Sequence, residues 1–166
     1  SKMTNSQYFW IPRNEAGTSS TLYTMLDIAR AGYLEARPIH PEKIDRVLRA
    51  SWKFVSDGQY ETIRTVNRMM VDLSTHGAFL GDCDDAAVMA AAMLLRWKRL
   101  VLMFDKKTGS PGAHAWFVAM RPPKETAFAH VFVVAQMDDG HTFRIDPTVP
   151  PDAPYAGWES MLVPIF

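Results

Sequence analysis

The sequence contains a single cysteine in 166 residues, so it can form neither an intramolecular disulfide nor a cysteine-rich zinc site. Neither sign of charge dominates, because 18 basic and 18 acidic residues give a formal net charge of zero. The lack of a basic excess argues against a nucleic-acid-binding protein. The longest apolar run, residues 86–95, is shorter than the ~20 residues that a membrane span needs. We therefore expect a soluble protein without a membrane span, and residues 1–10 do not predict a signal peptide.

The length suits one domain with one core. Residues 1–16 are polar, with a cluster of three aromatic side chains, and are expected to form an N-terminal arm. The domain itself is expected to have three parts along the chain, which are a helical part at 17–98, a β part at 99–150 and a wrapping tail at 151–166. Helical patterns followed by strand patterns indicate an α+β fold.

Apolar residues recur at helical spacing in the first part of the chain. The first predicted helix has Ser19 or Ser20 as its cap and ends near Gly32. A further helix, from about Cys83 to about Trp97, is apolar on nearly every face, which is typical of a buried core helix. The three helices expected before it lie within residues 17–37, 41–55 and 61–76.

The spacing of apolar residues then changes to that of β-strands, and we expect these strands to form an antiparallel sheet packed against the helices. Residues 138–140 predict a three-residue hairpin loop with Gly140 in the left-handed conformation. This loop would pair Met137 with His141 and place Asp146 opposite Phe132. The four predicted strands lie within residues 100–104, 114–120, 128–137 and 142–149.

The lone Cys83 lies between Asp82 and the pair Asp84 and Asp85, at the start of the predicted core helix. With Asp82 as the cap, Cys83 would be the first helical residue, where the helix dipole favours a thiolate. Free backbone N–H groups there are suited to hold an oxyanion, although the neighbouring carboxylates disfavour the thiolate. The alternatives are a helix cap beside a small buried cysteine, or a cation site, which is less favoured because carboxylates so close in sequence rarely surround one ion.

Two residues of the predicted strands complete a possible catalytic set. Taken alone, His130 on an apolar strand is typical of a structural residue, and Asp146 before a proline is typical of a turn. In the order Cys83, His130, Asp146, however, the three residues match a nucleophile, a base and an acid that orients the base.

The segments GDCDDAAVMAAAMLL, AHVFVVAQ and FRIDPTV together resemble the transglutaminase-like cysteine-enzyme superfamily, which has a papain-like fold. They are most similar to its small phage-encoded members. The resemblance implies that Cys83, His130 and Asp146 form a catalytic triad that attacks a peptide or protein amide through an acyl-enzyme. No cofactor or metal is expected. By the same resemblance, the protein would act in the host cytoplasm or the virion, with cell-wall peptides or virion proteins as partners.

One segment departs from the family pattern, since KRLVLMFDKKTGSPGAHAWF has His114 where members carry an arginine, and His-Ala-Trp is itself a form of the family histidine motif. His114 is therefore a second candidate base. We favour His130, because only one hairpin separates it from Asp146. The leading hypothesis is a cysteine peptidase or amidase. The alternatives are a virion or tail component that keeps the fold as an interaction module and, less favoured, a transamidase.

Overall fold

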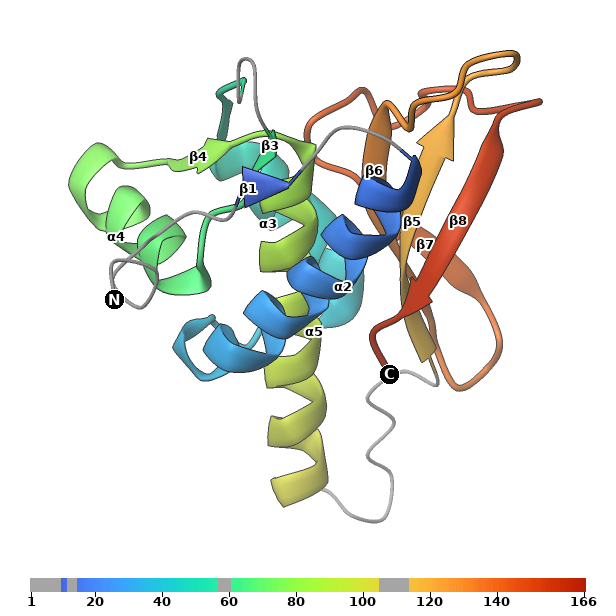
Figure 1. Ribbon diagram of the computed structural model, residues 1–166. Coiled ribbons are helices and arrows are strands. Elements are labelled where there is room, and N and C mark those ends of the chain that lie inside the picture. The colour runs from blue at the N-terminus through green and yellow to red at the C-terminus, as the bar shows by residue number, and fades with distance from the viewer. Residues whose placement is uncertain (1–9, 12–14, 57–60, 105–113) are drawn as a thin grey trace.

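The computed structural model describes residues 10–11, 15–56, 61–104 and 114–166. These residues form four α-helices, a four-stranded antiparallel sheet and two small two-stranded pairings, which confirms the predicted α+β class. Figure 1 shows helix α5 running through the molecule, with the sheet on one side of it and α4 on the other. Among the described segments, no helix combines the length and apolar character needed to cross a membrane.

All the described helices lie before residue 105, with short strands between them, and four longer strands follow. The helices are α2 (Glu15–Gly32), α3 (Ile44–Ser51), α4 (Val66–His76) and α5 (Cys83–Phe104), with the short 3-10 helices η1 (Tyr33–Glu35) and η2 (Pro41–Lys43). The strands are β1 (Trp10–Ile11), β2 (Trp52–Phe54), β3 (Glu61–Thr62), β4 (Phe79–Gly81), β5 (His114–Arg121), β6 (His130–Gln136), β7 (Thr142–Ile145) and β8 (Glu159–Pro164).

Helix α5 forms the centre of the core, as its composition predicts. Every residue from Ala86 to Leu94 is at most 2% exposed. Helix α2 packs along α5, and strand β6 lies against it from the sheet. A helix that is apolar all round is stable only when it is covered in this way on its different sides.

The four-stranded sheet has the order β7-β6-β5-β8, and its two faces carry separate apolar clusters. Val131 and Val133 point into the main core with α5. Phe132 belongs to a second apolar cluster on the opposite face, where Tyr155 and Trp158 pack. Successive residues of β6 therefore point to opposite faces of the sheet, as in any β-strand.

The β6–β7 hairpin has the predicted three-residue loop. Gly140 adopts φ 89°, and its N–H donates to the Met137 carbonyl at 2.9 Å. The Met137 N–H donates to the His141 carbonyl at 2.9 Å, and Gln136 pairs with Thr142. The predicted register is therefore confirmed, because the shape of the loop sets the pairing of every residue that follows.

The start of the first helix was predicted wrongly. Helix α2 begins at Glu15, so neither Ser19 nor Ser20 caps it. The helix tolerates polar residues in its first turns because they bond to its own backbone, as the Thr21 hydroxyl does to the Gly17 carbonyl at 2.8 Å. Of the predicted N-terminal arm, residues 1–9 and 12–14 lie outside the described residues.

Residues 100–104 are helical, which corrects the predicted strand there. Helix α5 continues to Phe104 because no glycine or proline interrupts the chain after Trp97. The apolar run that suggested a strand reflects only the end of this helix, where Leu102 and Met103 are about half exposed. A short apolar run has no period of its own, so spacing could not distinguish the two structures.

Three short segments also differ from the prediction. Trp52 was expected on a helix but begins β2, which pairs in parallel with β4, and its indole N–H donates to the Gly81 carbonyl at 3.0 Å. The third helix begins at Val66 rather than near residue 61, with the Thr65 hydroxyl as its cap. The tail does not simply wrap over the sheet, because its residues 159–164 form the edge strand β8 beside β5.

Asp82 and Asp85 stabilise the amino-terminal end of α5, because the side chain of each accepts a hydrogen bond from the backbone of the other. The Asp82 carboxylate accepts from the N–H groups of Asp84 and Asp85, while the Asp85 carboxylate accepts from the Asp82 N–H at 3.1 Å. Asp85 is fully buried and also pairs with the Arg64 guanidinium at 2.6 Å. This arrangement has the logic of a capping box, in which each side chain satisfies a backbone donor of the other residue.

Gly81 leaves the space that this arrangement needs, so we predict that Gly81→Ala destabilises the protein. A β-carbon at position 81 would lie 2.6 Å from the Asp85 β-carbon, and Asp85 is held on both oxygens. Overpacking of this kind costs ~1–3 kcal/mol, which chemical denaturation would measure. Ala at Gly77, which has φ 72° but nothing within 4 Å, measures the cost of backbone strain without overpacking, and Gly81→Ala should destabilise the protein more. A Gly81→Ala variant as stable as the wild type would contradict the prediction.

His141 ties the β6–β7 hairpin to η2. Its Nε2 lies 2.8 Å from the Glu42 carboxylate, and its Nδ1 lies 2.6 Å from that of Asp139. The hydrogen bond to Asp139 is the main cause that raises the pKa of His141 above its ordinary 6.5, while the bonds to His141 lower the pKa of Asp139. The bridge is therefore complete only when His141 is charged and Asp139 is ionised.

We predict that the stabilising effect of His141 depends on pH. Because its pKa is raised on folding, its contribution is fully present below about 6.5 and is lost as the pH rises through the raised pKa. The difference in melting temperature between the wild type and His141→Gln should be largest at about pH 5 and disappear by about pH 9. The exposed His114→Gln is the control, and an equal difference at both pH values would refute the role of the bridge.

Candidate active site

His130 and Asp146 form a hydrogen-bonded pair almost shielded from water. His130 Nε2 lies 2.7 Å from Asp146 Oδ1, and the two side chains are only 10% and 4% exposed. An imidazole held by one nitrogen has a fixed ring orientation, which is what a general base requires. The predicted contact between these two residues is therefore confirmed.

The hairpin register brings the pair together. Val133 pairs with Ile145, so the next position places Asp146 opposite Phe132. His130 lies two residues from Phe132 on the same face, which makes the contact a diagonal one that long side chains can bridge. A register shifted by one residue would have put Asp146 on the other face.

Helix α3 holds the backbone of Asp146 in place. The Asp45 carboxylate accepts from the Asp146 N–H at 2.7 Å, and the Arg49 guanidinium donates to the Asp146 carbonyl at 2.8 Å. Arg49 also donates to the Val149 carbonyl and pairs with Asp45 one helical turn away. These bonds join the helical part of the chain to the end of β7, so the position of the Asp146 carboxylate does not depend on the hairpin alone.

Tyr155 covers the pair from the tail. Its ring stacks on His130 with centroids 5.6 Å apart and an interplanar angle of 18°, and it stacks on Phe132 in the same way. Its hydroxyl donates to Asp146 Oδ2 at 3.4 Å. Arg144 lies over the Tyr155 ring and donates to carbonyls of the tail, which keeps this segment against the sheet.

The surroundings of Tyr155 link the thiol to this pair. Burial raises the pKa of Tyr155 to about 12, and negative charge on Asp146 and, to a smaller extent, on Cys83 adds to the increase. The tyrosine therefore stays protonated at neutral pH and acts as a donor. This influence of Cys83 on Tyr155, together with the packing of α5 against β6, indicates that the start of α5 lies near the start of β6 and the end of β7.

Cys83 is the first residue of α5, as predicted, and its side chain is half-buried. The thiol lies 3.9 Å from Asp84 Oδ1, a long and weak contact. The predicted role of the first-turn N–H groups needs correction, because those of Asp84 and Asp85 donate to the Asp82 carboxylate. These two amides are occupied by the helix cap and do not serve an oxyanion.

His114 lies at the opposite end of the sheet. It pairs with Gln136, whereas His130 pairs with Met120, six residues further along β5. That separation corresponds to about 20 Å along the strand. His114 is exposed and its ring lies beside Trp116, so the structure does not bring it to Cys83 or Asp146.

The Asp82 and Asp85 side chains are engaged in the helix cap and the Arg64 ion pair, and the Asp84 carboxylate lies beside the Cys83 thiol. Across the described ranges, no group of three or more histidine, cysteine, aspartate or glutamate side chains is arranged to hold a metal ion. Their geometry is that of a structural cap.

Asp45, Arg49 and Tyr155 were missed by the sequence analysis. Asp45 and Arg49 have the i, i+4 spacing of an ordinary surface ion pair, and Tyr155 lies in a proline-rich tail. No local pattern distinguishes them, because the contacts that matter join them to other elements of the fold.

Comparison with protein-family models, with curated proteins and with solved structures gave no match. What the site can do chemically therefore follows from its own residues and their geometry.

Proposed function

We propose that the protein is a thiol-dependent amide hydrolase of the transglutaminase-like type, with Cys83 as the nucleophile, His130 as the base and Asp146 as the residue that orients the base. The observation that carries the proposal is the 2.7 Å bond between His130 Nε2 and Asp146 Oδ1. The pair is nearly buried, and α5, which begins with the only cysteine of the chain, packs against the strand that His130 begins. A thiol at the amino terminus of a helix is activated when a histidine–aspartate pair serves it as the base.

The bond to Asp146 assigns different roles to the two ring nitrogens. With Nε2 donating to the carboxylate, the neutral imidazole has an unprotonated Nδ1. Nδ1 is then the nitrogen that takes the thiol proton, and Asp146 stabilises the imidazolium that results. Tyr155 supports this by donating to the second oxygen of Asp146.

The proposed reaction has two stages. His130 takes the proton of Cys83 as the sulfur bonds to the amide carbonyl carbon, which leaves negative charge on the carbonyl oxygen. His130 then gives this proton to the nitrogen as the C–N bond breaks, so an amine leaves and a thioester remains. A water molecule gives a proton to His130 and attacks the thioester, the carboxylic acid leaves, and the sulfur recovers its proton.

Water is the acceptor we favour, because it reaches an open site from the solvent, whereas an amine acceptor needs a binding site of its own. Transamidation is the less favoured variant of the same chemistry. The substrate class in this proposal is a peptide or protein amide, with cell-wall peptides and virion proteins suggested by the resemblance to small phage-encoded members.

A second candidate is an interaction module that keeps the fold without catalysis. The surroundings of Cys83 favour it, because the thiol lies 3.9 Å from the Asp84 carboxylate, which disfavours a thiolate. The Tyr155 ring stacked on His130 also covers one face of the proposed base. The reactivity of the thiol distinguishes the two candidates.

We predict that Cys83 reacts with iodoacetamide at about pH 6 at least about ten times faster than a free thiol, because a thiolate paired with an imidazolium persists below the ordinary thiol pKa. The measurement is unambiguous, because the chain has no other cysteine. Cys83→Ala should remove labelling and any amide cleavage while keeping the circular dichroism spectrum. Labelling as slow as that of a buried alkyl thiol would favour the interaction module.

We predict that His130→Ala lowers the rate of amide cleavage by ~10²–10⁴-fold, the usual range for loss of a general base. It should also reduce alkylation of Cys83 at about pH 6 to the rate of a free thiol. His114→Ala is the matched control and should change both rates less than about twofold. If His114→Ala abolished either rate while His130→Ala left it intact, the assignment of the base would be wrong.

A further inference from the structure

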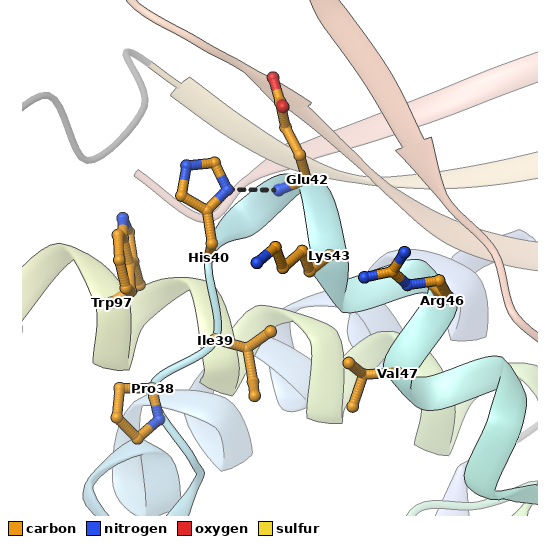
Figure 2. Close-up of a pocket in the computed structure, with 8 residues that line it drawn as sticks. All are labelled: Pro38, Ile39, His40, Glu42, Lys43, Arg46, Val47 and Trp97. Atoms are coloured by element: carbon orange, nitrogen blue, oxygen red, sulfur yellow. Dashed lines mark hydrogen bonds between the residues drawn. The ribbon is translucent and has the colours of Figure 1, made fainter.

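A groove of about 770 Å³ lies between the η2–α3 segment and the second half of α5. Figure 2 shows Ile39 and Val47 on one side of it, Trp97 on another, and the charged ends of Lys43 and Arg46 reaching toward the same space. The first three side chains are half-buried and both cationic ones are exposed. The groove thus combines an apolar surface and an aromatic wall with two positive charges.

The two cations have no anionic partner among the residues that the structure describes. Within the described part of the chain, neither the Lys43 nor the Arg46 side chain forms an ion pair or a hydrogen bond. Glu42 is the only acidic residue among the described residues that line the groove. Its carboxylate is bound to His141 Nε2 at 2.8 Å and is directed away from the other side chains of Figure 2. The positive charge of the groove is therefore not neutralised from within.

The aromatic wall is held in place before any ligand arrives. The His40 and Trp97 rings meet edge to face with centroids 5.3 Å apart. His40 Nδ1 accepts the Glu42 N–H at 3.3 Å, which fixes the imidazole to the start of η2. A preformed wall lowers the entropic cost of binding.

The groove is separate from the candidate active site. Trp97 lies fourteen residues after Cys83 on the same helix, which is about 20 Å along its axis. Asp45 and Arg49 belong to the same short helix as Arg46, but their side chains bond to the Asp146 segment and do not line the groove.

We propose that this groove binds an acidic segment of a partner protein, in which carboxylates pair with Lys43 and Arg46 and an apolar side chain packs against Ile39, Val47 and Trp97. Charge complementarity and the open shape favour an extended peptide over a compact ligand. Two cations on a chain of zero net charge are too few for a nucleic-acid site, which needs a basic stripe. The proposal does not depend on the proposed function.

Fluorescence anisotropy with a short labelled peptide of alternating glutamate and leucine tests this. The double variant Lys43→Glu/Arg46→Glu should weaken binding about tenfold or more, and binding should weaken as salt is added. Arg30→Glu/Lys53→Glu makes the same change in net charge outside the groove and should weaken binding less than about twofold. Trp97→Ala should weaken binding, whereas Trp97→Phe should retain most of it. Cys83→Ala should bind as the wild type does, which separates this site from the chemistry.

Several results would overturn the proposal. An equal loss in the two charge-reversal variants would show general electrostatic attraction. Equal binding of the matched glutamine–leucine peptide would show that charge does not direct recognition. Tighter binding of a single-stranded oligonucleotide would assign the groove to nucleic acid, and full competition by equimolar citrate would assign it to small anions. Circular dichroism of each variant confirms that the fold is retained.

Discussion

The buried carboxylate of Asp85 is the constraint on which the start of the core helix depends. It is fully buried, and its oxygens accept from the Arg64 N–H at 2.7 Å, the Arg64 guanidinium at 2.6 Å and the Asp82 N–H at 3.1 Å. A buried charge that loses its partner destabilises a protein by ~3–5 kcal/mol. These bonds therefore fix where α5 begins, and with it the position of Cys83. Gly81 completes the constraint by leaving room for the Asp85 side chain.

A second set of bonds fixes the sheet relative to the helices at the same region. Asp45 accepts a hydrogen bond from the Asp146 N–H, and Arg49 donates one to the Asp146 carbonyl. The Tyr155 ring stacks on the His130 ring. The thiol and the histidine–aspartate pair are thus each held by supporting contacts. Supporting contacts of this kind hold the side chains of an active site in the geometry that catalysis needs. A stable interaction module would retain the same contacts. The reactivity of Cys83 decides between them.

Local patterns predicted the parts of the fold that depend on neighbouring residues. The hairpin register follows from the Asp138-Asp139-Gly140 loop, and the contact between His130 and Asp146 follows from that register. The same patterns failed at residues 100–104 and 159–164, which form the end of α5 and the edge strand β8. Short apolar segments have no distinguishing period, so their structure is set by what they pack against.

The sequence by itself determined the α+β class, the central helix with Cys83 at its start, and the side of the sheet on which His130 and Asp146 lie. Only the tertiary structure decided that Asp45 and Arg49, 101 and 97 residues before Asp146, hold its backbone. It also decided that the tail brings Tyr155 onto His130 and that Lys43, Arg46 and Trp97 line one groove. Those arrangements join residues that are far apart along the chain, and local propensity carries no information about which distant surfaces meet when the apolar core is buried.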